Sequence, residues 1–222
     1  AGVDPATVED VILGNATPEG EQGLLMGRLV ALRAGFPNEV GGATINRWCG
    51  SSMSAIHYAA GQIAMGAGDA FVAAGVESMT RVPMGGFNPM PNAQLMADVH
   101  GVYMGMGETA EIVAERYQLS REAQEAFAVE SHRKAAAARK AGKLRDEIVT
   151  VDGVDADGCI RPDTNLEGLS GLKPAFSATG SVTAGTSSPL TDGAAATLVC
   201  SAEYAREHNL TPLAVIRSMA IN

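Results

Sequence analysis

The chain has 222 residues, 46% hydrophobic and 18% charged, which suffices for a hydrophobic core and excludes general disorder. Its 16 basic and 25 acidic residues give a net charge of −9, which argues against a nucleic-acid-binding surface. We expect no membrane span, because no apolar run reaches roughly 18 residues, and no signal peptide. The three widely spaced cysteines form neither a disulfide framework nor a CxxC metal motif, so a reducing compartment is expected.

Apolar runs alternate with helical patterns over the first 75 residues. The pattern predicts strands at 8–13, 42–45 and 70–74, and helices at 23–33 and from Cys49 onward. Small residues fill most of the other faces of the helix after Cys49, so we expect this helix to be buried on all sides. The order strand, helix, strand, helix, strand predicts an α/β fold with a parallel sheet.

The composition changes from residue 79. A loop rich in Gly, Pro and Met at 84–91 precedes predicted helices, which lie at 107–117, 120–141 and 165–172. Ser120 is the expected N-cap of the longest helix and Gly142 its stop. After residue 183 the pattern predicts a buried strand at 194–200, a helix at 202–208 and a strand at 213–221. We therefore predict an α/β core, residues 1–80 and 186–222, interrupted by a mostly helical insertion at 81–185.

Cys49 is the cysteine best placed for chemistry. It follows a predicted strand and opens a predicted helix, within the sequence Asn-Arg-Trp-Cys-Gly-Ser-Ser at 46–52. Unpaired N–H groups and the dipole at a helix N-terminus favour a thiolate, and free amides at such a turn stabilise an oxyanion during acyl transfer. Gly50 would let a substrate approach the backbone. The alternative is a buried structural cysteine, and its position alone leaves both interpretations open.

No histidine is an obvious base for Cys49. His57 lies eight residues further along the same predicted helix, about 12 Å away and outside hydrogen-bond reach, and is interpreted as a core histidine. His132 and His208 are expected to be solvated, and His100 lies in a loop. The base is therefore expected to come from elsewhere.

Three further features are candidates for ligand binding. The segment 183–193 is dense in hydroxyl side chains and turn-forming residues, and is either a pocket lining or a connector. Arg161 and Lys173 flank the short predicted helix and could contact phosphates, although exposed basic residues usually have no such role. Four methionines could form a soft wall for a flexible apolar ligand or simply fill gaps: Met84, Met90, Met104 and Met106.

A series of segments, in order along nearly the whole chain, resembles the thiolase family. These segments are 45–53 (INRWCGSSM), 73–79 (AAGVESM), 106–111 (MGETAE), 120–128, 172–176 (LKPAF) and 183–195. Those around Cys49 and at 183–193 are most similar to the 3-ketoacyl-CoA thiolases of fatty-acid β-oxidation.

The resemblance implies a thiolase-like layered αβα core whose insertion is a loop domain covering CoA. It implies that Cys49 is the acyl-accepting nucleophile in the cleavage of 3-ketoacyl-CoA by CoA, which gives acetyl-CoA and a shortened acyl-CoA. Ser188 and Met106 match positions beside the pantetheine arm, and Arg161 matches a position near the CoA nucleotide. Lys173 is added by its proximity. CoA is then a cosubstrate, and no metal or other cofactor is implied.

The chain also departs from the family pattern. Thiolases have a second, similarly folded half with a Gly-His-Pro histidine, an Asn-Glu-Ala-Phe segment and a Cys-x-Gly cysteine, none of which occurs in these 222 residues. We therefore expect an N-terminal portion with negligible turnover on its own. The alternatives are a biosynthetic acetoacetyl-CoA thiolase, a condensing enzyme of fatty-acid synthesis, or a catalytically silent binder of acyl-CoA or lipid.

The resemblance also suggests partners and a compartment. Family members are usually homodimers or homotetramers, and bacterial members often join a hydratase/dehydrogenase subunit. A cytoplasmic location is expected, or a mitochondrial or peroxisomal one if the source is eukaryotic.

Overall fold

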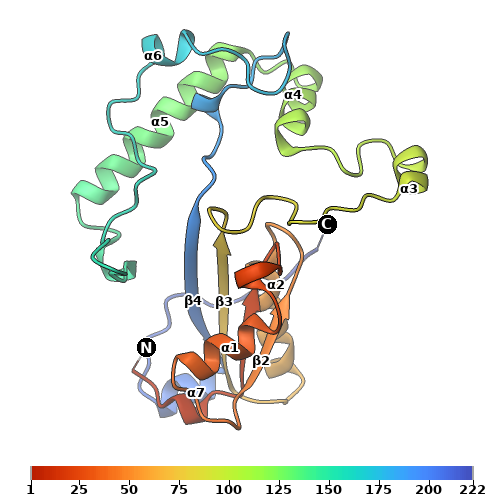
Figure 1. Cartoon of the computed structure of the whole chain (residues 1–222). Helices are drawn as coiled ribbons and strands as arrows, with labels where there is room; N and C mark the ends of the chain where they lie inside the picture. Colours follow the sequence, from red (N-terminus) through yellow and green to blue (C-terminus); the bar gives the residue numbers. More distant parts are fainter. Residues whose placement is uncertain (1, 222) are drawn as a thin grey trace. The chain divides into compact units, whose positions relative to one another are not determined.

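The computed structural model describes residues 2–221. Contacts within the chain divide it into two compact units (Figure 1). The first comprises Ala1–Met90 with Leu190–Asn222, and the second comprises Pro91–Pro189. That the insertion covers CoA stays a prediction.

The first unit is built on a four-stranded sheet in the order β2-β1-β3-β4. Strands β1 (Asp10–Gly14), β2 (Gly41–Ile45) and β3 (Ala70–Ser78) are parallel, which confirms the predicted βαβαβ arrangement. Strand β4 (Asp192–Cys200) is antiparallel to β3, with Asp192 opposite Ser78. The chain leaves β3 and returns to β4 at the same end of the sheet, so β4 has to run in the opposite direction.

Two helices pack on opposite faces of this sheet. Helix α1 (Met26–Arg33) buries Ala31 in a cluster that contains Val11, whereas α2 (Ser51–Ala64) buries Ala55 and Ala59 in a cluster that contains Ile12. Successive residues of a strand point to opposite faces, so Val11 and Ile12 show that the sheet lies between the helices. The predicted αβα layers are therefore confirmed (Figure 1). A short helix, α7 (Ala202–Glu207), follows β4.

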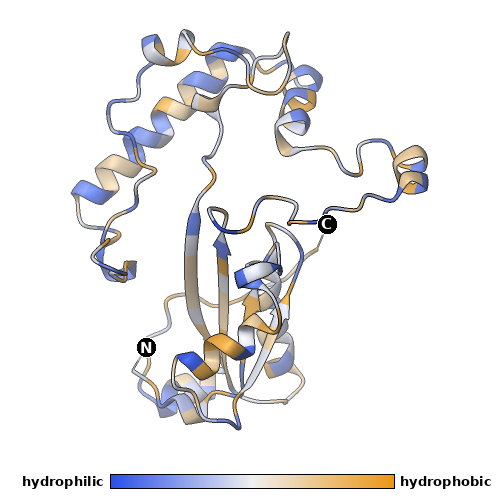
Figure 2. Ribbon diagram, in the orientation of Figure 1, coloured by the Kyte–Doolittle hydropathy of each residue, from blue (hydrophilic) through white to orange (hydrophobic). Residues whose placement is uncertain are grey.

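Glycines bring α1 close to the sheet edge. A Cβ on Gly27 would lie 2.0 Å from the Ala43 carbonyl oxygen, and one on Gly42 would lie 2.3 Å from the Arg28 Cα. Helix α1 is nevertheless largely hydrophobic, as the orange parts of its ribbon in Figure 2 show. Several of its larger side chains remain exposed, and Leu24 just before the helix is 90% exposed.

Three predictions about the first unit are wrong. Helix α2 is not buried on all sides, because only the face with Ala55 and Ala59 contacts the sheet, and Met53 is 57% exposed. Strand β4 is exposed from Asp192 to residue 197, because it is an edge strand. The strand predicted at 213–221 is irregular, because its apolar residues pair with no strand of the described part of the chain, and Leu213 is 99% exposed.

The second unit is helical, as predicted. Its helices are α3 (Ala93–Asp98), α4 (Met106–Arg116), α5 (Arg121–Lys140) and α6 (Leu166–Ser170). The Ser120 hydroxyl caps α5 by accepting a hydrogen bond from the Ala123 N–H, and Gly142 beyond its C-terminus has φ +72°. Both capping predictions are confirmed. None of the helices within residues 2–221 is long and apolar enough to cross a membrane.

A partly buried ion pair joins α5 to α6. The Arg121 guanidinium binds the Glu125 carboxylate and also donates to the carbonyl oxygens of Leu169 and Leu172, at 2.9 Å each. Glu125 is only 4% exposed. Because the buried carboxylate has a charged partner, and the Nη2 of that partner also binds two carbonyl oxygens, the pair can stabilise this helix contact.

Candidate active site

Cys49 lies on the turn between β2 and α2, at the carboxyl end of the parallel strands. Strand β2 ends at Ile45, and α2 begins at Ser51 after its N-cap Gly50. Cys49 is an exposed residue in this chain, not a buried one. Ligands of α/β proteins commonly bind beyond the carboxyl ends of parallel strands.

The residue before Cys49 has an unusual backbone conformation. Trp48 has φ +47°, in the left-handed region, although its side chain is 60% exposed and so is not held there by packing. This conformation costs a residue with a Cβ about 1–2 kcal/mol. Such strain persists only where the surrounding structure enforces it, and it is commonly found at functional sites.

Two polar side chains enforce the turn. Asn46 Oδ1 accepts a hydrogen bond from the Trp48 N–H at 2.9 Å, and its Nδ2 donates to the Ala16 carbonyl at 3.1 Å. The Ser51 hydroxyl accepts from the Arg47 N–H at 2.8 Å and donates to the Trp48 carbonyl at 2.6 Å. The turn is therefore tied both to the loop after β1 and to the first residue of α2. Sequence reasoning missed both residues, although they flank Cys49 at short spacing.

Glycines of the sheet allow the first turn of α2 to approach the strand ends. A Cβ on Gly14 would lie 2.4 Å from the Ser52 backbone nitrogen, and one on Gly75 would lie 1.9 Å from the Ser52 hydroxyl oxygen. Gly14 and Gly75 are partners across β1 and β3. These two positions set the height of the Cys49 turn above the sheet.

The first turn of α2 offers free donors. In the described part of the chain, the N–H groups of Ser52 and Met53 have no acceptor, as is usual at a helix N-terminus. With the helix dipole, such donors favour a negative charge. Cys49 thus lies directly before a helix N-terminus, as the sequence predicts, while its role as nucleophile stays a prediction.

A polar cluster lies at the same end of the sheet. The Glu77 carboxylate accepts hydrogen bonds from the Ala16 N–H at 2.8 Å and from Gln22 Nε2 at 2.7 Å. Gln22 is buried and also accepts from the Ser78 N–H. Asn15, which is 1% exposed, donates to the Val76 carbonyl at 2.8 Å. This cluster fixes the loop after β1, on which Asn46 depends, and no role was predicted for it.

Within residues 2–221, no histidine is hydrogen-bonded to Cys49. His57 is half-buried on α2, His100 is exposed, and His208 stacks on Tyr204. His132 is half-buried rather than solvated, because its Nδ1 accepts a hydrogen bond from the Arg161 N–H at 3.2 Å.

The other two cysteines differ from Cys49. Partial desolvation and a hydrogen bond with the Asp157 carboxylate raise the pKa of the Cys159 thiol, and desolvation raises the pKa of Cys200. Both favour the neutral thiol, the less nucleophilic form. No group of three potential metal ligands is found among residues 2–221.

The four predicted CoA-binding residues all belong to the second unit, and all are exposed: Ser188, Met106, Arg161 and Lys173. Met106 begins α4, where a Cβ on Gly107 would clash with the Phe176 ring at 2.1 Å. Within residues 2–221, no hydrogen bond or ion pair joins any two of these four side chains. Their roles stay predictions.

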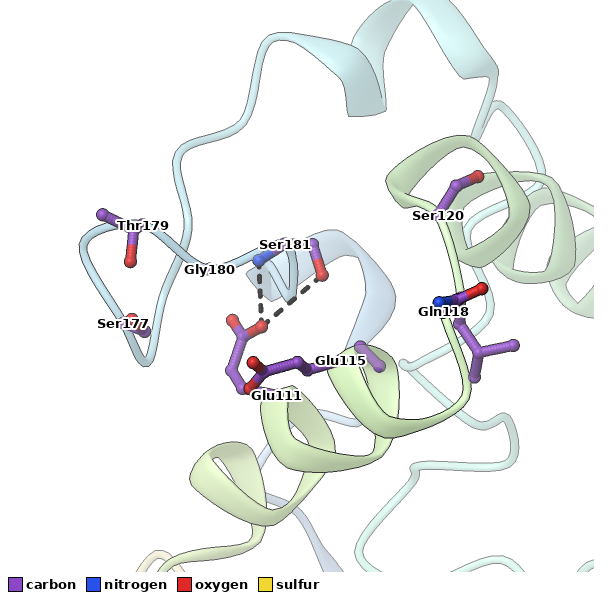
Figure 3. A pocket seen from close by; sticks show the side chains of 10 residues that line it. Glu111, Glu115, Gln118, Ser120, Ser177, Thr179, Gly180 and Ser181 are labelled. Atoms are coloured by element: carbon purple, nitrogen blue, oxygen red, sulfur yellow. Dashed lines mark hydrogen bonds between the residues drawn. The ribbon is translucent and has the colours of Figure 1, made fainter.

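A cavity of about 550 Å³ lies elsewhere in the second unit, between α4 and the loop at 177–181 (Figure 3). The Glu111 side chain lines this cavity, and its carboxylate accepts hydrogen bonds from the N–H groups of Ser181 and Val182, at 2.9 Å each. None of the predicted CoA-binding residues lines it. Glu111 here stabilises the loop that leads to residue 183.

The sequence matches the thiolase N-terminal domain over residues 1–203. The chain belongs to the thiolase family. It is 45% identical to the 3-ketoacyl-CoA thiolase of Bacillus subtilis (strain 168), over all of this chain and 61% of that protein. It is 46% identical to the 3-ketoacyl-CoA thiolase of Saccharophagus degradans, over all of this chain and 59% of that protein.

A solved structure agrees with this assignment. Human mitochondrial 3-ketoacyl-CoA thiolase, in complex with CoA, matches with a TM-score of 0.84 and 33% identity, covering 95% of this chain and 57% of that one. This thiolase chain therefore spans about three fifths of the length of the relatives that it matches. Its fold is that of the N-terminal part of a thiolase.

Proposed function

We propose that this chain supplies the nucleophile of a 3-ketoacyl-CoA thiolase, and that Cys49 is that nucleophile. The observation that carries the proposal is the exposed Cys49 thiol on a strained strand-to-helix turn, directly before a helix whose first N–H groups are free. The names of the relatives support the reaction, since both bacterial proteins are 3-ketoacyl-CoA thiolases.

In the first half-reaction, the Cys49 thiolate attacks the 3-keto carbon of a 3-ketoacyl-CoA. The bond between carbons 2 and 3 then breaks, and its electron pair stays on carbon 2. A proton is delivered to that carbon, so acetyl-CoA leaves and the shortened acyl group remains as a Cys49 thioester.

In the second half-reaction, the thiol of a fresh CoA loses its proton and attacks the thioester carbonyl. The bond to Cys49 breaks, which regenerates the thiolate and releases the shortened acyl-CoA. Covalent catalysis thereby divides the carbon–carbon cleavage into two acyl transfers. We propose that Ser188 and Met106 hold the pantetheine arm and that Arg161 and Lys173 lie near the phosphates of CoA. No metal takes part in this scheme.

The proton transfers need a base, which we propose lies outside residues 1–222. No histidine is hydrogen-bonded to Cys49 within residues 2–221. This proposal is consistent with the greater length of the relatives, since this chain covers only about three fifths of each.

The test is intact-protein mass spectrometry of the full-length protein after mixing with a 3-ketoacyl-CoA in the absence of free CoA. We expect one added acyl group, located on Cys49 by peptide mapping, and none in the Cys49→Ala variant. Addition of CoA should remove the group. An acyl group on Cys159 or Cys200 instead, or none on any cysteine, would refute the proposal.

We further propose that the protein is a homodimer or homotetramer that joins a hydratase/dehydrogenase subunit in a β-oxidation complex. Its proposed location is the cytoplasm, or a mitochondrion or peroxisome if the source is eukaryotic. Support comes from the exposed apolar side chains around α1, of which Leu24 is the most exposed. Size-exclusion chromatography with light scattering tests the oligomer.

A further inference from the structure

We propose that Ser51 is a positioning residue for Cys49, an inference that rests on the proposed function. Its buried hydroxyl holds the left-handed turn at Trp48 and so fixes where the Cys49 sulfur lies. The Ser51 side chain itself is not part of the acyl-transfer chemistry.

The geometry of the hydrogen bonds carries this proposal. The Ser51 hydroxyl binds the Arg47 N–H on one side of Trp48 and the Trp48 carbonyl on the other, at 2.8 and 2.6 Å. It therefore joins the peptide group before Arg47 to the peptide group after Trp48, and so restrains the backbone angles of both residues. Ser51 is 3% exposed, so water cannot readily replace the hydroxyl.

The strain at Trp48 explains why such a clamp is needed. With φ +47° and a largely exposed side chain, Trp48 gains little from packing in this conformation. If the hydroxyl were removed, the partly buried Arg47 N–H would lose its acceptor, and Trp48 could relax to a negative φ. Cys49 is the next residue, so rotation at Trp48 would move its sulfur.

Asn46 holds the same turn from the other side but does not duplicate Ser51. The Asn46 side chain accepts a hydrogen bond from the Trp48 N–H, whereas the Ser51 hydroxyl binds the Arg47 N–H and the Trp48 carbonyl oxygen. Loss of the Ser51 hydroxyl therefore leaves the Trp48 carbonyl oxygen with a single hydrogen bond, from the backbone N–H of residue 51 at 3.0 Å.

The test compares Ser51→Ala with a matched control in the full-length protein. Ser54→Ala removes a hydroxyl from the same helix, and that hydroxyl has no hydrogen-bond partner in the part of the chain that the structure describes. We expect Ser51→Ala to slow alkylation of Cys49 by iodoacetamide about tenfold and to lower kcat similarly, with KM changed less than about twofold. Ser54→Ala should leave both rates unchanged, and Ser51→Thr, which keeps the hydroxyl, should restore them.

A second background separates positioning from general stability. Glycine adopts positive φ without strain, so in a Trp48→Gly protein the clamp is not needed. There, Ser51→Ala should slow alkylation by less than about twofold. An equal loss in both backgrounds, or no loss in either, overturns the proposal.

If Ser51→Ala alone does not fold, the protein with both Trp48→Gly and Ser51→Ala must fold and be alkylated as fast as the Trp48→Gly protein. If that double variant also fails to fold, the proposal is overturned. If the wild-type protein forms no acyl adduct on Cys49, the proposed function fails, whereas the alkylation comparison still decides whether Ser51 positions the thiol.

Discussion

Gly14→Ala should displace the first turn of α2 and, with it, Cys49. The added methyl group would lie 2.4 Å from the Ser52 backbone nitrogen and 2.5 Å from the Ser51 carbonyl carbon. Side-chain Cβ atoms essentially never approach other atoms within 3.0 Å, so the helix and strand must separate by about 0.6 Å. Backbone atoms cannot rotate away as a side chain can, and the displacement therefore reaches the turn that holds Cys49.

The magnitude follows from this displacement. Overpacking of this kind costs about 1–3 kcal/mol of unfolding free energy. A shift of the nucleophile by a large part of an ångström should lower the rate of acyl transfer about tenfold. Urea denaturation and iodoacetamide alkylation of Cys49 measure the two effects separately in the full-length protein.

Two comparisons make the prediction specific. Gly61→Ala lies on the same helix with open space around its Cβ, and should stabilise the protein by about 0.5–1 kcal/mol. The methyl group of Gly75→Ala would meet the Ser52 hydroxyl and not a backbone atom, so the loss of stability should be smaller than for Gly14→Ala. Adding Ser52→Gly should restore stability to the Gly75→Ala protein, but not to the Gly14→Ala protein. A Gly14→Ala protein with wild-type stability and wild-type alkylation would refute this account of the close approach.

Further predictions address other parts of the chain. Burial raises the pKa of the Asp10 carboxyl, so its charged form is less favoured in the folded than in the unfolded chain; Asp10→Asn should raise the free energy of unfolding at pH 7, measured with urea, by less than about 1 kcal/mol since the group is partly exposed. That gain should disappear below the ordinary pKa of an aspartate, and a gain that persists there would contradict the cause. Since the pKa values of Cys159 and Cys200 are raised, iodoacetamide at neutral pH should modify Cys49 first and the other two only at alkaline pH, which peptide mapping can follow; equal rates at neutral pH would argue against it. Arg121→Ala leaves the buried Glu125 carboxylate unpaired and should destabilise the second unit by about 3 kcal/mol, more than Glu125→Gln does, as hydrogen exchange in α5 would report; the opposite order would show that the pair is not stabilising. The 222 residues alone should release no measurable acetyl-CoA from a 3-ketoacyl-CoA, and Cys49-dependent release would show that the base lies within them.

The alternation of apolar runs and helical patterns was enough to predict the parallel part of the sheet and both covering helices. It failed where burial depends on a neighbour rather than on the segment itself. The apolar residues at 213–221 resemble a strand, but they pair with no strand among residues 2–221. The small residues of α2 resemble a fully buried helix, yet only the face with Ala55 and Ala59 meets the sheet.

For the site, the position of Cys49 between a strand and a helix could be read from the sequence, and its surroundings could not. A tryptophan rarely has positive φ, so nothing in the residue types predicts the Trp48 conformation. The functions of Gly14 and Gly75 depend on distances between segments that are far apart in the sequence. The role of Ser51 depends on its hydrogen bonds to two backbone groups, which the residue type alone does not predict.

The exposed indole next to Cys49 has a practical consequence. Trp48 is the one tryptophan among the 222 residues, and it is separated from the sulfur by a single peptide unit. Its fluorescence emission therefore reports on the immediate surroundings of the thiol without any attached dye. Formation and breakdown of an acyl adduct could be followed in real time by stopped-flow, with natural substrates and an unlabelled protein.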